Sequence, residues 1–282
     1  MMKKGLTNGF LILVFCIGLS LLLYPTVSDY WNSLHQSGII ASYSEAVAQI
    51  DSDRYDAIWE SAHVYNAELA ETGNTWILTE SQRADYESQL NISVNGAISY
   101  IEIPAINCSL PIYHGTDDAV LQVAIGHFEG SSLPTGGEST HCVLSGHRGL
   151  PSAQLFSRLD KLVVGDLFYL QTLDQTLTYE VDLISIVLPN EMDLLTIQEG
   201  EDLCTLVTCT PYGVNSHRLL VRGHRVENQQ VKKTQRITAD ATQIEPMVVA
   251  PVAAVPMLLV MLVLLMITTR KKRKGVRKCE KE

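Results

Sequence analysis

A cysteine at the end of an apolar run is the first candidate for a reactive group in this sequence. Cys209 closes the run LCTLVTC, and the Thr-Pro-Tyr-Gly segment that follows it does not continue a strand. The thiol is therefore expected at the lip of a strand, where it can face a groove. It is a nucleophile only as the thiolate, which nearby positive charge favours. On position alone, a small buried hydrophobic residue is an equally good interpretation.

The next apolar run supplies that positive charge. Its string HRLLVRGHR carries three arginines, of which Arg218 stands nine residues after Cys209. A loop of about seven residues can fold the second strand back so that these two side chains meet. We expect the other two arginines, Arg222 and Arg225, to be surface or wall residues of the strand.

A histidine between glycines is the second candidate. His147 follows the run CVLS within Ser-Gly-His-Arg-Gly, and the glycines let the backbone turn sharply and present the imidazole at a strand end. A single strand-end histidine is more often structural than catalytic. Paired with a strand-end cysteine beside an arginine, it becomes a candidate general acid/base for nucleophilic catalysis.

Two other chemistries are disfavoured by spacing. A metal site would need Cys204, Cys209, His217 and His224 to converge, yet strand residues five or seven apart point to opposite faces, and zinc ligands are normally more closely spaced. We therefore predict no metal and no cofactor. A serine hydrolase is disfavoured because the sequence lacks a G-x-S-x-G elbow and Ser145 lacks the strand-to-helix context.

Short β-rich runs must position these residues. From Ala97 onward, turns rich in Gly, Pro and Asp separate seven such runs, and the clearest break is LPTGG at 133–137. Seven or more short runs in about 130 residues predict a closed or nearly closed β-barrel or a sandwich. The runs are AISYIEIP, LPIYHG, HCVLSGH, DLFYLQTL, LTYEVDLISIVLP, LCTLVTCTP and RLLVRGHRV.

The segment before these runs is expected to be helical, because residues 29–90 contain no proline. Apolar residues recur at spacings of three and four through Ser44–Glu71, which predicts one amphipathic helix ended by a Thr-Gly-Asn segment. A second short helix is expected from about Thr79 to Leu90, capped by Thr-Glu-Ser-Gln. A coiled-coil stalk is the alternative, but its heptad is not sustained.

Both ends of the chain carry an uncharged apolar run. Leu6 to Tyr24 follows two lysines, and Met247 to Thr269 precedes the basic segment RKKRKGVRKCEKE. At ~1.5 Å per residue, either run can cross a ~30 Å hydrocarbon core, and the positive-inside rule keeps both termini in the cytoplasm. A cleaved signal peptide is the alternative for the first run, although that run is long and no A-x-A-like site follows it.

The composition between these ends excludes other classes of protein. Ten of the 21 basic residues and two of the 31 acidic residues lie in the terminal segments, which leaves a net charge near −18 over Pro25 to Pro246. This acidity argues against a nucleic-acid binder, and a hydrophobic fraction of 46% excludes general disorder. Four cysteines fall in this region, but each lies in or at the end of a strand-like run, so we expect no disulfides.

The motifs around the candidate residues resemble those of one family. Thr205-Leu206-Val207-Thr208-Cys209 resembles the TLxTC active-site motif of sortases. Over roughly residues 97–226 the chain is similar to the class C, pilin-polymerising sortases, in the strings YIEIPAINCSLPIYHGTDD, GHFEGSSLPTGG, STHCVLSGHRGLPSAQLFSRLDKLVVGD and TLVTCTPYGVNSHRLLVRGHR. The resemblance implies an extracytoplasmic transpeptidase, mainly β, built on an eight-stranded β-barrel.

The resemblance also implies residue roles and partners. It makes Cys209 the nucleophile, His147 the general acid/base, and Arg218, the arginine of an N-x-H-R segment, the oxyanion-stabilising or substrate-orienting group. The implied reaction cleaves an LPxTG-like sorting signal through a thioester, which a pilin lysine resolves into an isopeptide bond. The implied partners are pilins or other surface proteins that bear such a signal, together with the lipid bilayer, and no nucleic acid.

These inferences divide the chain into six parts and place the catalytic part outside the cell membrane. The parts are a cytoplasmic stub with a signal or anchor helix (1–24), a helical segment that includes a possible lid (25–95), the sortase β-barrel (96–228), a linker (229–246), a transmembrane helix (247–269) and a basic cytoplasmic tail (270–282).

One class C feature is missing, and two rival functions stay open. Many class C sortases carry an Asp-Pro-aromatic lid, but no Asp-Pro occurs in this sequence. Trp76 or Tyr86 are candidates to plug the groove instead, with ordinary packing as the alternative, so we expect a weakened, altered or absent lid. The rivals to pilin polymerisation are a sortase that anchors proteins to a peptidoglycan precursor and a non-catalytic, membrane-tethered assembly scaffold.

Overall fold

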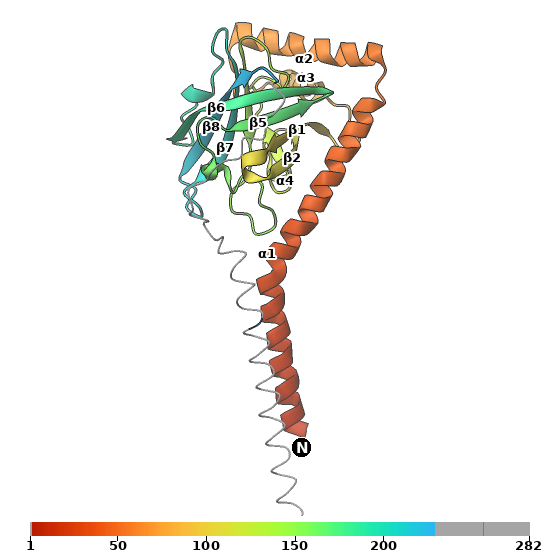
Figure 1. The fold of residues 1–282 in the computed structure, drawn as a ribbon, viewed down its shortest axis with the longest axis vertical. Coiled ribbons are helices and arrows are strands. Elements are labelled where there is room, and N and C mark those ends of the chain that lie inside the picture. Colours follow the sequence, from red (N-terminus) through yellow and green to blue (C-terminus); the bar gives the residue numbers. More distant parts are fainter. Residues whose placement is uncertain (1, 229–255, 257–282) are drawn as a thin grey trace, which may run out of the picture. The chain divides into compact units, whose positions relative to one another are not determined.

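The described strands form a closed β-barrel (Figure 1). The computed structural model describes residues 2–228 and Pro256, with side chains described from residue 12. The chain divides into two units, and the unit Asp29–Lys232 contains all eight strands, in the order β1-β2-β3-β4-β7-β8-β6-β5. The pairs β2–β3 and β4–β7 are parallel and the other six pairs are antiparallel. The eight-stranded barrel implied by the resemblance is confirmed.

Seven of the eight strands coincide with the predicted β-rich runs. The strand that was missed, β3, has only three residues, one of them glycine, so it gives no alternating pattern to detect. The strands are β1 (Ala97–Ile103), β2 (Cys108–His114), β3 (Ile125–His127), β4 (Thr140–Ser145), β5 (Leu167–Thr172), β6 (Gln175–Val187), β7 (Asp202–Thr210) and β8 (His217–Val226).

Helices and short turns complete the described part of the chain. The helices are α1 (Met2–Ala48), α2 (Ser52–Thr72), α3 (Glu80–Ser88) and α4 (Asp118–Leu121), and the 3-10 turns are Pro104–Ile106, Leu159–Lys161 and Asp193–Leu195.

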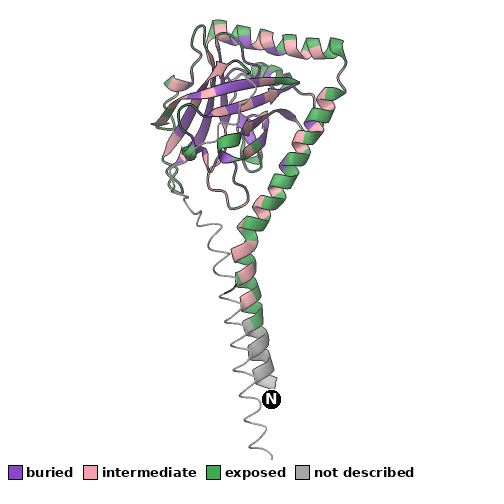
Figure 2. Ribbon diagram, viewed as in Figure 1, coloured by how far each residue is buried: buried purple, intermediate pink, exposed green. Residues whose placement is uncertain are grey.

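Buried residues recur along the strands (Figure 2). Their apolar side chains form the core of the barrel. Phe168 of β5 and Tyr179 of β6 stack there with ring centroids 5.4 Å apart. Gly223 of β8 admits these rings, since a Cβ at that position would lie 2.7 Å from the Phe168 ring. In a small barrel of this kind, side chains fill the interior and leave no room there for a substrate. A substrate must therefore bind on the outer surface or at a strand end.

The predicted single helix over Ser44–Glu71 is wrong, because residues 49–51 are not helical and separate α1 from α2. The Asp51 carboxylate accepts the N–H of Arg54 at 2.9 Å and so caps α2. An aspartate in this position favours the start of a new helix over continuation of the old one. The predicted end of α2 is confirmed: Gly73 adopts a φ of 81°, and its N–H bonds to the Leu69 carbonyl.

The second predicted helix is confirmed as α3, and Tyr86 proves to be a packed core residue, the alternative to its plugging of the groove. Thr79 and Gln82 form a reciprocal capping box at the start of α3. The Tyr86 hydroxyl is buried in the core, lies 2.8 Å from His127 Nδ1 and accepts the Gly115 N–H at 3.0 Å. Because this ring is enclosed on all sides, Tyr86 does not plug a surface groove.

The N-terminal apolar run belongs to α1. Within the described residues, one helix is long and apolar enough to cross a membrane, Ile12–Ala48, with a mean hydropathy of 1.8. The predicted linker, second transmembrane helix and basic tail lie outside the described residues, apart from Pro256. The prediction of a second membrane helix therefore stays a prediction.

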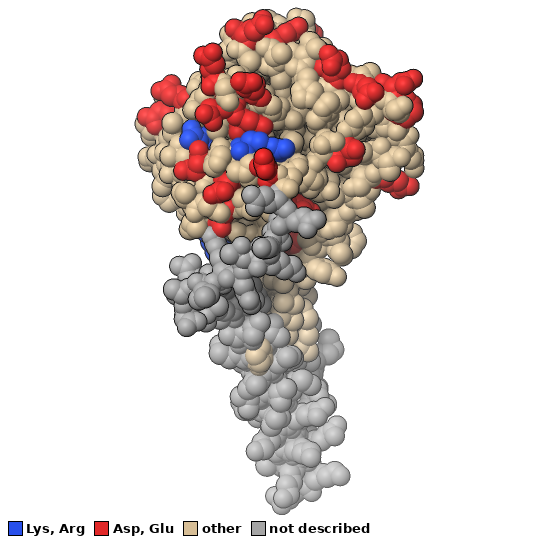
Figure 3. Space-filling view, turned by 45° about the horizontal axis from the view of Figure 1, so that its top comes forward, with Lys and Arg blue, Asp and Glu red and all other residues tan. Residues whose placement is uncertain are grey.

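On the face of the molecule in Figure 3, acidic residues visibly outnumber basic ones.

Candidate active site

β7 and β8 bring the predicted cysteine and arginine together. The two strands are antiparallel neighbours, and their register pairs Cys209 with Arg218. Residues paired in this way have Cα atoms about 4.5–5.5 Å apart and side chains on the same face of the sheet. The loop between the strands has six residues, 211–216, which is close to the length expected from the sequence.

β4 brings the predicted histidine to the same level of the sheet. β4 runs parallel to β7, with Ser145 paired to Val207. The Gly146 N–H bonds to the Val207 carbonyl at 3.0 Å and carries this pairing beyond the end of β4. His147 follows Ser145 by two residues, just as Cys209 follows Val207 by two, so the register extended beyond β4 would bring these two residues to the same level. Cys209 and Arg218 therefore lie on adjacent strands, and His147 follows the end of a third strand next to β7.

Close packing fixes the turn that carries His147. A Cβ on Gly146 would lie 2.7 Å from the Phe156 ring, and a Cβ on Gly149, whose φ is 82°, would lie 2.7 Å from the Tyr212 ring. The Phe156 N–H also bonds to the His147 carbonyl at 3.1 Å. Packing thus requires both glycines, and backbone conformation also requires Gly149, so the turn that carries His147 is held in place.

Arg148 is a residue that the sequence reasoning did not single out. Its side chain is only 11% exposed, and its Nη2 lies 2.5 Å from Asp160 Oδ2. Its Nη1 donates to the Thr210 hydroxyl at 3.5 Å. Arg148 thus connects the neighbour of His147 to the neighbour of Cys209 and adds a second guanidinium to the region. Its position next to His147 in the sequence is the only signal that could have pointed to it.

The three arginines of β8 differ in their partners. Within the described chain, the Arg218 guanidinium donates to two backbone carbonyls, those of Asn215 at 3.3 Å and His217 at 3.1 Å. Arg222 instead makes two bonds to Asp182, at 3.1 and 2.8 Å. Arg225 lies over the Tyr179 ring, 5.8 Å from its centroid. The positions of Arg222 and Arg225 agree with their expected role as wall residues.

An apolar floor adjoins Cys209 and Arg218. Val207 lies two residues before Cys209, and Leu220 lies two residues after Arg218, so both share the outer face of the sheet with the reactive pair. Val143 of β4 packs with them, and Leu195 from the β6–β7 loop covers the cluster. The partly buried residues around this floor are Trp76, Phe128, Val187, Met192 and Leu194.

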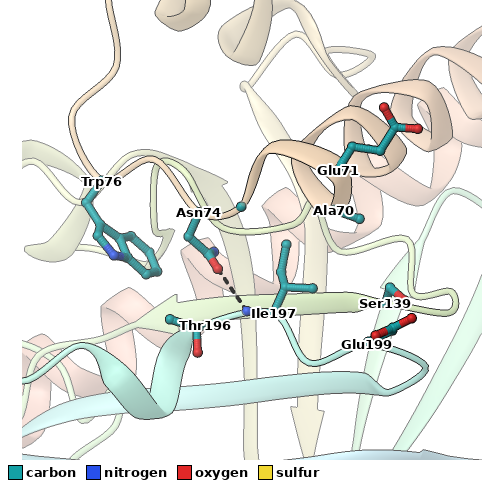
Figure 4. Close-up of a pocket in the computed structure, with 9 residues that line it drawn as sticks. Ala70, Glu71, Asn74, Trp76, Ser139, Thr196, Ile197 and Glu199 are labelled. Atoms are coloured by element: carbon teal, nitrogen blue, oxygen red, sulfur yellow. Dashed lines mark hydrogen bonds between the residues drawn. The ribbon is translucent and has the colours of Figure 1, made fainter.

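The segment after α2 is fastened to two of the surrounding loops. Asn74 donates to the Gly130 carbonyl at 3.0 Å and accepts the Ile197 N–H at 2.8 Å, the bond drawn in Figure 4. Trp76 meets Phe128 edge to face, with ring centroids 5.5 Å apart. A cavity of about 560 Å³ opens beside this segment, lined by Ala70, Glu71, Gly73, Asn74, Trp76, Ser139, Thr196, Ile197 and Glu199. The segment therefore forms a wall that links the β6–β7 loop to the loop after β3.

A second histidine of β4 serves the fold. His141 is buried, with Nδ1 2.8 Å from the Thr196 carbonyl and Nε2 2.7 Å from the Thr205 hydroxyl. Burial lowers the pKa of His141 to about 4. The neutral ring thus donates from Nδ1 to the carbonyl and accepts the hydroxyl proton at Nε2. The effect is to hold the β6–β7 loop against the sheet.

The cysteines of the outer region are free and differ in burial. Cys108, Cys142, Cys204 and Cys209 form no disulfides. Burial raises the pKa of the Cys204 thiol well above its usual value, which keeps that group protonated. Cys204 points into the core and Cys209 lies on the outer face, so the two cannot converge on one metal. Among the described residues, no group of three or more His, Cys, Asp or Glu side chains could hold a metal ion.

Comparison with known proteins identifies the family of this fold. A sortase-domain model matches residues 101–226. Sortase D of Bacillus subtilis (strain 168) is 35% identical over 133 residues, which is 46% of this chain and 64% of that protein. The crystal structure of sortase C1 from Streptococcus agalactiae is 53% identical, with a TM-score of 0.66 over 68% of this chain and all of that one. Sortase C of Streptococcus pneumoniae is 46% identical, with a TM-score of 0.60 over 67% of this chain and 96% of that chain.

Proposed function

Because this chain belongs to the sortase family, whose members are cysteine transpeptidases, we propose that it is a membrane-anchored, class C enzyme that polymerises pilins. The single observation that supports this most is the register that pairs Cys209 with Arg218, while His147 follows the end of the neighbouring strand β4. Neighbours named sortase C favour polymerisation, and one of them, from Streptococcus pneumoniae, is described with respect to pilin substrate specificity.

In the first step, the Cys209 thiolate attacks the threonine carbonyl carbon of an LPxTG-like sorting signal. The new C–S bond forms while the carbonyl oxygen gains negative charge, and Arg218 N–H groups stabilise that charge. Protonated His147 donates its proton to the departing glycine nitrogen as the C–N bond breaks. The products are a thioester on Cys209, a free glycine amine and a neutral imidazole.

In the second step, the amine of a pilin lysine attacks the thioester carbonyl. Neutral His147 takes the proton that the amine loses, so the imidazole returns to its starting state. The C–S bond then breaks, the Cys209 thiolate leaves, and an isopeptide bond joins the two pilins. Water would give hydrolysis by the same route, so acceptor binding must exclude it.

The partners of Arg218 suit this role. Backbone carbonyls hold its guanidinium, and among residues 2–228 it has no carboxylate partner like the one that Arg222 has in Asp182. Its charge therefore remains available to an oxyanion, and a planar guanidinium offers several N–H donors in a fixed geometry.

We further propose that no movable lid closes over Cys209. The connection between α2 and α3 is short, residues 73–79, and Asn74 ties it to both adjoining loops. Limited proteolysis of residues 70–95 should give equal protection with and without a sorting peptide. Protection that rises when the peptide is added would instead reveal a mobile lid.

The function is tested by supplying competing acceptors. The purified chain is incubated with an LPxTG-like peptide and either a lysine-bearing pilin domain or a peptidoglycan-precursor amine. Our proposal predicts an isopeptide product with the pilin lysine, and none in the Cys209→Ala variant. A product formed only with the wall amine would favour the anchoring sortase, and polymer formed by Cys209→Ala would favour the scaffold.

A further inference from the structure

One face of α1 is committed to the barrel. Beyond residue 28, Asn32 donates to the Ser152 carbonyl at 2.7 Å, and Asp29 accepts the Gln154 N–H at 2.9 Å. Gln36 donates to the Val123 carbonyl at 2.9 Å. Further along, the Tyr43 hydroxyl donates to the Ile98 carbonyl at 3.0 Å and accepts the Leu173 N–H at 2.8 Å. These polar contacts hold one side of the helix against the catalytic unit.

The opposite face of the same helix carries large apolar side chains that the described chain leaves exposed. Tyr30, Trp31 and Leu34 are 66%, 68% and 54% exposed. At about 100° per residue, their mean direction lies roughly 180° around the helix from the residues that contact the barrel. We call these three residues the α1 stripe. Two aromatic side chains beside a leucine, all more than half exposed, form a surface suited to apolar contact.

The sequence on either side indicates what covers this stripe. Trp31 lies seven residues after Tyr24, the end of the apolar run, so it lies at most about 25 Å from that end in any conformation. Tryptophan and tyrosine are enriched where a membrane protein crosses the boundary between lipid and water. No Lys or Arg occurs between Lys4 and Arg54, so charge does not draw this segment to an anionic surface.

We propose that the α1 stripe inserts into the outer-leaflet interface of the bilayer, between the phospholipid headgroups and the acyl chains. This rests on the membrane anchoring in the proposed function. Because Asn32 and Asp29 on the other face hold residues 152–154, in the loop that follows His147, the helix connects the lipid surface to that loop. The stripe thereby sets the orientation in which the catalytic groove meets substrates held in the same membrane.

Fluorescence quenching of the full chain in phosphatidylcholine vesicles tests the placement of the stripe. The reporter variant keeps Trp31 and carries Trp59→Phe and Trp76→Phe, while its matched control keeps only Trp59, on α2; circular dichroism confirms that both are folded. We expect phospholipids brominated close to the headgroup to quench Trp31 but not Trp59, with iodide leaving Trp31 unaffected. Iodide quenching of Trp31, or protection from both quenchers by a protein partner, would overturn the proposal.

A second arm separates this proposal from the proposed function. The triple variant Tyr30→Ser, Trp31→Ser, Leu34→Ser is compared with the control Ser33→Ala, Ser37→Ala, which leaves the stripe intact. We expect the triple variant to cleave a soluble sorting peptide at the wild-type rate but to process a membrane-anchored precursor several-fold more slowly. Equal rates on both substrates, or equal losses on both, would overturn the role of the stripe. If even the wild-type chain cleaves neither substrate, the proposed function fails, and the quenching result alone decides the stripe.

Discussion

Strands β4, β7 and β8 each contain one residue of a pair of the same type, and the second residue of that pair lies at the end of the strand or just beyond it. We call His141, Cys204 and Arg222 the buried set, of which the Arg222 side chain is 19% exposed, and His147, Cys209 and Arg218 the open set. The members of the buried set each have a local reason to be inert.

Hydrogen bonds, burial and an ion pair keep the residues of the buried set from acting on a substrate. His141 is held neutral between a carbonyl and a hydroxyl, Cys204 is enclosed in the core, and Arg222 is neutralised by Asp182. In the open set, Arg218 bonds to backbone carbonyls, and Cys209 is partly exposed at the strand end. Residue type alone therefore does not make a reactive site. The reactive residues are those at a strand end whose hydrogen-bonding groups and charge are still available to a substrate.

Replacing each of the two cysteines by alanine, in separate variants, tests the comparison with the largest expected effect. Cys209→Ala should abolish cleavage of a sorting peptide, because no other described thiol occupies the outer face beside Arg218. Cys204→Ala should retain cleavage and lower the free energy of unfolding by about 1–2 kcal/mol through a small cavity in the core. Peptide cleavage assays and urea unfolding measure the two effects. Cleavage that persists in Cys209→Ala would show that the open set is not the reactive one.

The arginine pair should show the next largest difference. Arg218→Ala should slow acylation by about a hundred- to a thousandfold, the usual effect of removing one oxyanion donor. Arg222→Ala should act on stability instead, at a cost of about 1–3 kcal/mol, because it leaves the Asp182 carboxylate without its partner. Single-turnover acylation and thermal unfolding of both variants give the values. Similar acylation rates in the two variants would contradict the distinction.

Acid should destabilise the protein through the buried histidine. The pKa of His141 is about 4 in the fold, below the value of about 6.5 expected in the unfolded chain, so the unfolded state binds more protons between these values. This contribution, up to roughly 3 kcal/mol, is fully present above pH 6.5 and is lost as the pH falls through 4.

Urea unfolding of the wild type and of His141→Gln between pH 4 and 7 tests this slope. The variant should show a shallower decline in acid than the wild type. Some slope should remain, because burial also lowers the pKa of His114 to about 4. Parallel curves for the two proteins would show that His141 is not the source.

The last prediction concerns the turn that carries His147 of the open set. Gly146→Ala should reduce stability by about 1–3 kcal/mol, since the new methyl group meets the Ile125 and Phe156 side chains. It should also slow acylation, because the same turn positions His147. Gly165→Ala is a control for the loss of a glycine, since a Cβ there meets no atom within 4 Å, although its φ of 93° adds strain. Unchanged acylation in Gly146→Ala would show that the turn tolerates displacement.

Local patterns predicted the parts of the site that a hairpin joins. Cys209 and Arg218 belong to consecutive strands, so the length of the loop between them was enough to bring them together. The alignment of His147 with Cys209 depends on the parallel pairing of β4 with β7, whose partners lie 62 residues apart in the chain. Pairing over such a separation leaves no local signal, so the resemblance supplied that link.

The features that the sequence did not reveal depend on tertiary contacts. Arg148 matters because Asp160 and Thr210 meet it, and Asn74 matters because it bridges two loops far along the chain. The sequence could not decide whether Tyr86 plugs a groove or packs in the core, because the burial of a helical tyrosine depends on what packs over it. The break at residues 49–51 was missed because the apolar spacing continues across it, while the capping bond of Asp51 is a competing local signal.

Peptide mapping of the acyl-enzyme tests the central claim most directly. The chain is incubated with an LPxTG-like peptide, quenched in acid, digested and analysed by mass spectrometry. The account predicts that the mass of the peptide up to its threonine is added to Cys209, in the wild type and in Cys204→Ala, and is absent from Cys209→Ala. An adduct on any other residue, or cleavage without any adduct in an acid-quenched time course, would contradict it.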